Sequence, residues 1–227
     1  MDEIDLIRSR AIARERVRPV LDGVAQLTEV LRRAGYASVV AAVAEHAVFL
    51  HPDTVAQARG ALFRTIRDMP RRGQFEVLED GRRVLLDDNR SPTDAFLWAA
   101  GLTRGLDVQF NHVWGGSRSP NTYTALWNLF ATPAFLAKTT DTSNHPEVTA
   151  ALCFRSFDLF GLRPATEPVP SEPYGYRELR WAPHPDAVTD LAGIMRARLR
   201  ASPRSRTTIA CREIGWLFSD WLPDPTI

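Results

Sequence analysis

Hydrophobic positions recur at helical spacing through the first 70 residues of the chain. Apolar side chains at about every third or fourth position, with arginines off that stripe, predict three or four successive helices. Gly35 is the kind of residue that ends a helix, and Asp53, just after a His-Pro break, is the kind that caps the next one. The expected helices are a first one reaching about residue 21 and others at about 22–34, 36–50 and 54–67.

A hairpin pattern replaces the helical spacing after residue 73. Short apolar runs flank Asp80-Gly81, and an Asp-Gly pair between such runs is a strong signal for a β-hairpin, here expected over 74–87. A helix through residue 102 should follow. Ser91 suits its N-cap, and the proline after Ser91 suits the first helical position.

The pattern over residues 107–161 predicts a strand, a loop, a second strand and a helix. The first strand ends at His112, and a Gly-Gly-Ser turn follows it. The second β-like run covers 130–138, and the helix opens at His145, which precedes a proline. We expect the rest of the chain to be built around this segment.

The C-terminal part predicts a linker and two more helices. Residues 163–173 are rich in proline, glutamate and serine, which indicates an extended linker or surface wrap, and helices are expected over 186–199 and 207–221. The chain is thus predicted to be α+β and predominantly α, with a small ββα unit embedded between helical parts. The expected divisions are a helical region with a β-hairpin (1–106), the ββα unit (107–162), and a linker with C-terminal helices packing on the same body (163–227).

Composition and charge favour a soluble globular protein. Hydrophobic residues make up 44% and charged residues 24%, which is ordinary for a globular chain. A formal net charge of +1 argues against a large electropositive surface but allows local patches. The N-terminus has no long apolar core, and the stretch 39–50 is too short to span a bilayer. We therefore expect a cytoplasmic protein with no membrane partner.

Cysteines and arginines add two local observations. Cys153 and Cys211 sit in apolar contexts typical of buried cysteines, and no four-cysteine zinc cradle exists. Four arginines cluster near the end of the helix expected at 54–67. The simpler interpretation is a solvated helix face, and the alternative is an edge that contacts phosphate, which guanidinium groups bind in a bidentate manner. The cluster consists of Arg64, Arg67, Arg71 and Arg72.

The residue order in the central segment resembles that of the HNH, or ββα-metal, endonuclease family. Hydrolysis of a phosphodiester needs a general base, neutralisation of the charge on the phosphate, and a group that orients the base. In this family the base is the second residue of a pair that ends the first strand. The pair here is Asn111-His112, so the resemblance implies that His112 is the base. The family's middle asparagine looks like Asn128, whose amide would brace the loop that carries the base.

The resemblance also implies a divalent metal ion, Mg²⁺, Mn²⁺ or Zn²⁺. His145 looks like the family's last histidine, a metal ligand, and Asp141 is a fallback ligand from the same loop. Asn111 stands where an acidic or imidazole ligand is usual, and an amide oxygen is a weaker ligand than a carboxylate. Arg118 in the Gly-rich loop is a candidate phosphate contact, and Lys138 is a candidate for stabilising transition-state charge, although either could be a plain solvated side chain.

The expected function is metal-dependent cleavage of phosphodiester bonds, with nucleic acid as the partner; DNA is the favoured substrate and RNA the alternative. The first alternative is a catalytically degenerate unit that binds nucleic acid or protein, and Asn111 favours it. The second is an enzyme of small-molecule metabolism on the same fold, which a deep apolar pocket beside His112 would indicate. The third is a helical scaffold in which none of these residues meet.

Overall fold

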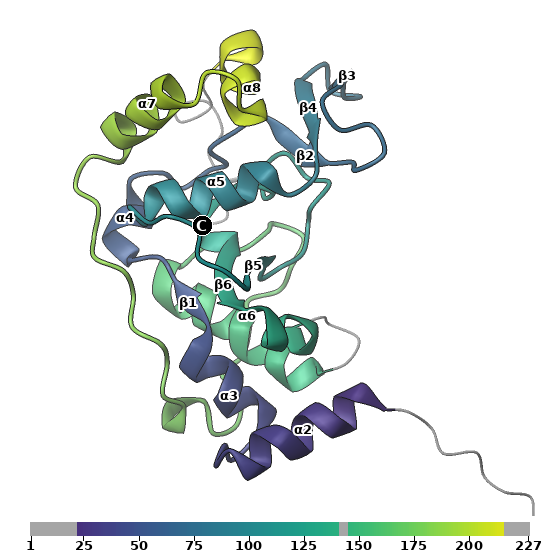
Figure 1. Cartoon of the computed structure of the whole chain (residues 1–227), viewed down its shortest axis with the longest axis vertical. Helices are drawn as coiled ribbons and strands as arrows, with labels where there is room; N and C mark the ends of the chain where they lie inside the picture. Colours follow the sequence, from purple (N-terminus) through teal and green to yellow (C-terminus); the bar gives the residue numbers. More distant parts are fainter. Residues whose placement is uncertain (1–21, 141–144, 216–227) are drawn as a thin grey trace, which may run out of the picture.

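Two small three-stranded sheets form the β part of a helix-rich α+β protein, as predicted. The computed structural model describes residues 22–140 and 145–215 (Figure 1). The first sheet has the order β1-β6-β5 and the second the order β2-β4-β3. The first predicted helix, reaching residue 21, and the end of the last one, beyond residue 215, lie outside the described residues.

The first sheet is antiparallel throughout and carries β5 at its edge. Its strands are β1 (Val48–Phe49), β5 (Val108–His112) and β6 (Leu129–Pro133). The central strand β6 pairs with both neighbours, and His112 lies opposite Leu129. The second predicted strand, 130–138, is therefore shorter than expected. After residue 133 the chain turns into the 3-10 helix η2 (Ala134–Thr140), so Lys138 lies on that helix.

Strand β1 replaces the end of the helix predicted over 36–50. Helix α3 (Val39–His46) stops early, and Phe49 then pairs with Phe130 of β6, with ring centroids 5.6 Å apart. Both rings are at most 1% exposed. Burial of this aromatic pair in the sheet outweighs the weak local preference for helix.

The second sheet confirms the hairpin and corrects the helix predicted over 54–67. Strands β3 (Phe75–Val77) and β4 (Arg83–Asp87) pair antiparallel around the Asp-Gly turn. Helix α4 (Pro52–Ala56) ends after five residues, and β2 (Thr65–Arg67) then runs parallel to β4. The backbone between α4 and β2 is hydrogen-bonded to a distant segment of the chain. Leu62 N donates to the carbonyl of Thr124 at 3.3 Å. The arginine cluster therefore does not form a helix face.

The remaining helices agree with the sequence pattern in position. The helix predicted to run through residue 102 is α5, but its first turn is capped differently from the prediction. The Asp87 carboxylate accepts a hydrogen bond from Ser91 N at 2.7 Å, and the Ser91 hydroxyl caps no backbone N–H among the described residues. Asn89, with φ of 77°, precedes the helix. The helices are α2 (Gly23–Arg33), α5 (Arg90–Ala99), α6 (Pro146–Phe160), α7 (Leu191–Ala201) and α8 (Arg206–Ile214).

The segment from residue 163 to residue 190 is an extended wrap along one side of the molecule, with one short 3-10 helix, η3 (Tyr176–Glu178) (Figure 1). Ala182 N donates to the carbonyl of Ala44 at 2.9 Å. The Gln57 side chain holds the end of the wrap, because its Oε1 accepts from Leu191 N at 3.0 Å. These contacts fasten the wrap to α3 and α4.

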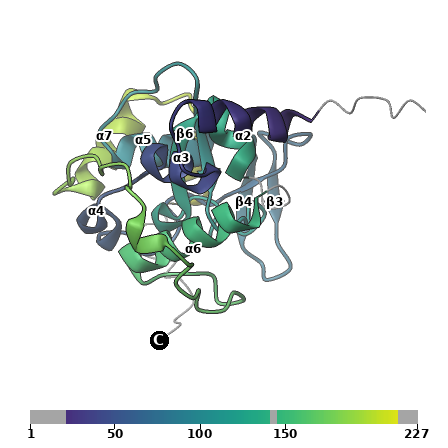
Figure 2. The ribbon, with the colours of Figure 1, turned by 90° about the horizontal axis from the view of Figure 1, so that it is seen from below.

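Helices α3 and α6 pack side by side on the first sheet (Figures 1 and 2). The core beneath α5 draws residues from all three predicted divisions, for example Leu50, Trp127 and Met195. None of the described helices is long and apolar enough to cross a lipid bilayer.

Candidate functional site at the end of β5

The central segment has the predicted order of strand, loop, strand and helix. Strands β5 and β6 pair, the loop of residues 113–128 joins them and ends in the 3-10 helix η1 (Leu126–Asn128), and α6 follows. Helix α6 lies against the loop beside both strand ends. Ser156 Oγ donates to the carbonyl of Trp127 at 2.7 Å, and Cys153 Sγ lies 3.7 Å from the carbonyl oxygen of Val113. The helix thus supports the backbone next to His112 and Asn128.

His112 is held in the tautomer that a general base needs. Its Nε2 lies 2.9 Å from the carbonyl oxygen of Tyr123. A carbonyl can only accept a hydrogen bond, so we assign the proton to Nε2, which leaves the lone pair on Nδ1. The ring also stacks on the Tyr123 ring, with centroids 5.4 Å apart and planes 16° apart. Orientation and tautomer are therefore both set by one neighbouring residue.

Burial keeps the His112 imidazole neutral. Desolvation lowers its pKa below the ordinary value, and the positive charge of Arg67 lowers the pKa further. The hydrogen bond to the carbonyl of Tyr123 raises the pKa, by less than desolvation lowers it but by more than Arg67 does. A neutral imidazole at physiological pH is able to accept a proton, which is the requirement for general base catalysis.

The Asn128 side chain holds the loop that follows His112. The side chain is fully buried, and its Oδ1 accepts from Trp114 N at 2.8 Å. Its Nδ2 donates to the carbonyls of Gly115 at 3.1 Å and Thr122 at 3.0 Å. One amide therefore satisfies three backbone groups of the loop, and the carbonyl that orients His112 belongs to the residue directly after Thr122.

The two glycines at the start of the loop offer a matched test of its packing. Gly115 and Gly116 both have positive φ, 68° and 70°, but a Cβ on Gly116 would lie 2.5 Å from Thr122 Oγ1, whereas a Cβ on Gly115 meets nothing within 4 Å. We expect Gly115→Ala to lower the free energy of unfolding by about 1–2 kcal/mol through the left-handed backbone. Gly116→Ala should lower it by about 2–4 kcal/mol, because overpacking adds to that cost.

Urea denaturation of both variants measures this difference. Equal losses would show that the Thr122 hydroxyl moves aside freely and does not hold the loop.

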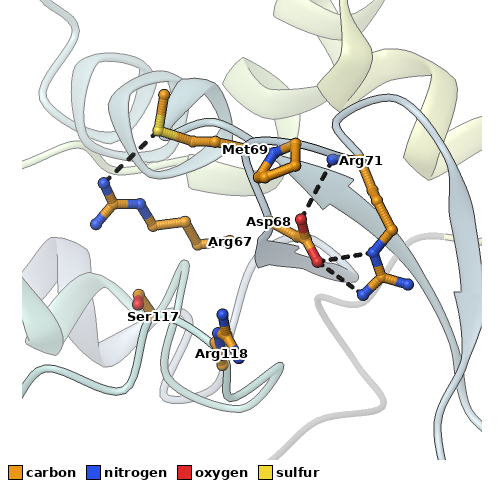
Figure 3. A pocket seen from close by; sticks show the side chains of 7 residues that line it. Arg67, Asp68, Met69, Arg71, Ser117 and Arg118 are labelled. Carbon is orange, nitrogen blue, oxygen red and sulfur yellow. Dashed lines mark hydrogen bonds and ion pairs between the residues drawn. The ribbon is translucent and has the colours of Figure 1, made fainter.

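An arginine-lined cavity opens beside this loop (Figure 3). Its volume is about 570 Å³. Arg67, the last residue of β2, connects it to the loop, because Arg67 N donates to the carbonyl of Ser117 at 2.7 Å. The Arg67 charge also reaches His112, as its effect on the pKa shows. We call this cavity the arginine pocket; it is lined by Arg67, Asp68, Met69, Pro70, Arg71, Ser117 and Arg118.

Positive charge exceeds negative charge in the lining of the arginine pocket, which holds three arginines and one aspartate. Arg71 pairs with Asp68 and with Glu76, each at 2.7 Å, and its hydrogen bond to Asp68 lowers the pKa of that carboxyl. Among the described carboxylates, none forms an ion pair with Arg67 or Arg118. Arg67 instead lies with its guanidinium 3.8 Å from the sulfur of Met69. Arg118 also lowers the pKa of Asp68 through its charge, without a close ion pair. The excess of guanidinium groups over carboxylates makes this cavity suited to an anion.

The predicted metal ligands do not form a recognisable seat within residues 22–140 and 145–215. Asn111 Nδ2 donates to Thr132 Oγ1 at 3.0 Å, and alternation along β5 turns Asn111 to the face opposite His112. His145 precedes α6, and its Nδ1 lies 3.0 Å from Glu147 Oε1. The described residues contain no group of three His, Cys, Asp or Glu side chains that could hold a metal ion. Asp141 lies outside the described residues.

The positions of His145 and Lys138 relative to His112 follow from the fold. His145 is eight residues before Cys153, the point where α6 meets the loop, which is about 12 Å along the helix axis. No hydrogen bond or ion pair joins His145 to His112 in the described part of the chain. The helix that carries Lys138 starts at the opposite end of the β5–β6 pair, where Ala134 N donates to the carbonyl of Asp107 at 2.7 Å. The structure thus brings His112 together with Asn128 and the arginine pocket.

The sequence pattern does not place two residues of the site. Arg67 belongs to the basic cluster for which a phosphate-contacting edge is the alternative interpretation, but its position beside the loop depends on the pairing of β2. Tyr123 carries no sequence signal, because its carbonyl and its ring contact His112 only in the folded loop. No protein-family model, curated protein sequence or solved structure matches this chain.

Proposed function

We propose that this protein is a nuclease that binds a nucleic-acid phosphodiester at the end of β5 and hydrolyses it with His112 as the general base. The observation that carries the proposal is a neutral imidazole, with its lone pair on Nδ1, whose pKa is lowered by the charge of Arg67, a residue that also lines the arginine pocket with Arg118. The arginine pocket is lined largely by charged side chains rather than apolar ones, which favours a phosphate over an apolar small molecule.

Each part of the site has a role in the reaction. Arg67 and Arg118 bind the non-bridging oxygens of the phosphate and neutralise the charge that develops there. His112 Nδ1 takes a proton from a water molecule, the water oxygen forms a bond to phosphorus, and the bond to the leaving sugar oxygen breaks. The leaving oxygen receives its proton from solvent. Asn128 and Tyr123 do not touch the substrate; they position the loop and the imidazole.

A divalent ion remains a separate prediction. The described side chains do not fit a metal seat, because the Asn111 amide bonds to Thr132 and faces away from His112. We therefore assign no step to a metal. The cleavage assay should be run on plasmid and on single-stranded DNA with Mg²⁺, Mn²⁺ or Zn²⁺ and with a chelator. Cleavage under any of these conditions supports the proposal, and no cleavage under all of them contradicts it.

Arg67→Ala and Arg118→Ala should each weaken binding of nucleic acid about tenfold. Each removes one phosphate contact, so the slope of log affinity against log salt should fall by about 0.7–0.9. Fluorescence anisotropy with labelled DNA at several salt concentrations gives both quantities. Arg33→Ala is the matched control, because Arg33 is an exposed arginine that pairs with Glu29 on α2. An equal effect of all three substitutions would indicate only a general loss of positive charge.

The second candidate function is binding of nucleic acid without hydrolysis. The observation that favours it is the lack of a three-ligand group among the described residues, with an amide at position 111. The two functions share the arginine pocket and differ at His112. Binding that depends on Arg67, with no cleavage by the wild-type protein, would select this second function.

A further inference from the structure

A second, smaller cavity is lined by Phe110 of β5, two residues before His112, and we propose that it binds the nucleotide flanking the scissile phosphate of a single-stranded substrate. Its volume is about 230 Å³. We call it the Phe110 pocket, and the side chains that matter here are Asn89, Arg90, Arg104, Phe110 and Arg206. This inference rests on the proposed function, because it extends the substrate strand beyond the arginine pocket.

Strand geometry places the Phe110 pocket beside the proposed base. Side chains two residues apart in a strand point to the same face, about 7 Å from each other, so Phe110 is the same-face neighbour of His112. Tyr123 makes the second connection. Its ring stacks on His112, and its hydroxyl accepts a hydrogen bond from Asn89 N at 2.9 Å. A strand whose phosphate lies at His112 would therefore have an adjacent nucleotide within reach of Phe110.

The pocket offers an aromatic face that is already held in place. Phe110 is partly exposed, and its ring packs on the buried ring of Phe96, with centroids 5.4 Å apart. The Arg104 guanidinium lies over the Phe110 ring, 6.0 Å from its centroid. An aromatic ring beside a cation is the arrangement on which unpaired bases stack while their phosphate is neutralised.

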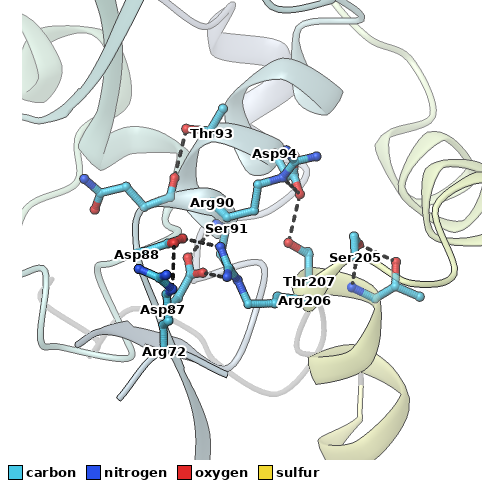
Figure 4. A network of polar contacts seen from close by, with 12 residues as sticks. Arg72, Asp87, Asp88, Arg90, Ser91, Thr93, Asp94, Ser205, Arg206 and Thr207 are labelled. Atoms are coloured by element: carbon cyan, nitrogen blue, oxygen red, sulfur yellow. Dashed lines mark hydrogen bonds and ion pairs between the residues drawn. The ribbon is translucent and has the colours of Figure 1, made fainter. Parts of the chain in front are cut away.

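Arg104 is the cation available to a ligand in this pocket. The other two arginines are committed to neighbouring carboxylates (Figure 4). Arg90 Nε lies 2.9 Å from Asp94, and Arg206 pairs with Asp88 and, at 3.3 Å, with Asp87. Arg104 forms no ion pair with any described carboxylate and is exposed. The ion pairs of Arg90 and Arg206 hold the side chains that line the pocket in place. Arg104 supplies the positive charge that is left for a ligand.

The requirement for a base on Phe110 predicts a preference for single strands. A base inside a duplex is stacked on its neighbours and cannot cover the ring without being unstacked, which costs free energy. The proposal therefore predicts tighter binding of a single-stranded oligonucleotide than of the same sequence in a duplex.

The test measures binding of a labelled twelve-nucleotide single strand and of a dinucleotide, by anisotropy, on a His112→Ala background that prevents turnover. We expect Arg104→Ala to weaken binding of the long strand about tenfold and to lower its salt slope by about 0.7. The dinucleotide should be nearly unaffected, because its single phosphate occupies the arginine pocket and it lacks the next phosphate along the strand, the one that Arg104 contacts. Phe110→Leu, which keeps an apolar contact with Phe96, should weaken the long strand by severalfold. Arg83→Ala is the control, because Arg83 also lies over a ring, that of Phe75, but at the far end of β4.

Outcomes for the two proposals are separable. If Arg67→Ala weakens both ligands and Arg104→Ala weakens neither, the Phe110 pocket is not a nucleotide site and the proposed function stands. Tighter binding of the duplex than of the single strand would also overturn the inference. If the His112→Ala protein, with all its arginines intact, binds neither the long strand nor the dinucleotide, both proposals fail together.

Discussion

Replacing His112 by alanine should lower the rate of phosphodiester cleavage by about 100-fold to 10,000-fold, the usual contribution of a general base. The reason is that His112 Nδ1 is the proton acceptor in the proposed site, with Nε2 committed to the carbonyl of Tyr123. Plasmid nicking and hydrolysis of a labelled oligonucleotide measure the loss. His51→Ala is the control, since His51 caps α4 and does not belong to the proposed site.

The pH dependence separates the role of a base from a purely structural role. Burial first, and then Arg67, lowers the pKa of His112, so the neutral, active form persists to lower pH than for a free histidine. Activity should therefore stay near its maximum at pH values below the ordinary histidine pKa of about 6.5 and decline only in more acidic solution. Arg67→Ala removes one cause of the lowered pKa. It should shift the acidic limb of the profile to higher pH.

Two results would contradict this assignment. Retained cleavage in His112→Ala would remove the base from the proposal. An acidic limb that does not move in Arg67→Ala would show that another group sets it.

The second large effect is expected from Asn128→Asp, which should lower the free energy of unfolding by about 3–5 kcal/mol. The carboxylate has no N–H to donate, so the carbonyls of Gly115 and Thr122 lose their buried partner and face negative charge instead. Only the bond from Trp114 N survives. Since the loop that orients His112 depends on this side chain, cleavage should fall as well.

Urea denaturation at several pH values tests the prediction. The buried carboxyl should have a raised pKa, so its cost is present above that pKa and decreases as the pH falls and the group becomes a neutral donor. The matched control is Asn111→Asp, expected to cost less than about 1 kcal/mol, because the Thr132 hydroxyl can turn and donate to the new carboxylate. Similar losses in both variants would show that Asn128 does not brace the loop.

The sequence by itself determined the elements whose signals are local. The Asp-Gly turn predicts the hairpin of β3 and β4, and the stretch before His112 predicts β5. Gly161, with φ of 64°, ends α6 where the pattern predicts. Caps and turns depend on residues within a few positions of each other, and amphipathic spacing depends on a single element, so both can be interpreted without knowing the rest of the fold. The helix-rich α+β class follows from these elements.

Tertiary structure alone decided the short strands and the surroundings of the base. Val48 pairs with Ala131, and Thr65 pairs with Leu85, so β1 and β2 exist because distant segments offer them partners. Neither strand is long enough to show a period-two pattern, and helical spacing predicted helices there instead. The same holds for the carbonyl of Tyr123, which selects the tautomer of His112. A sequence shows which side chains could do chemistry, but only folding decides which backbone groups and charges lie beside them.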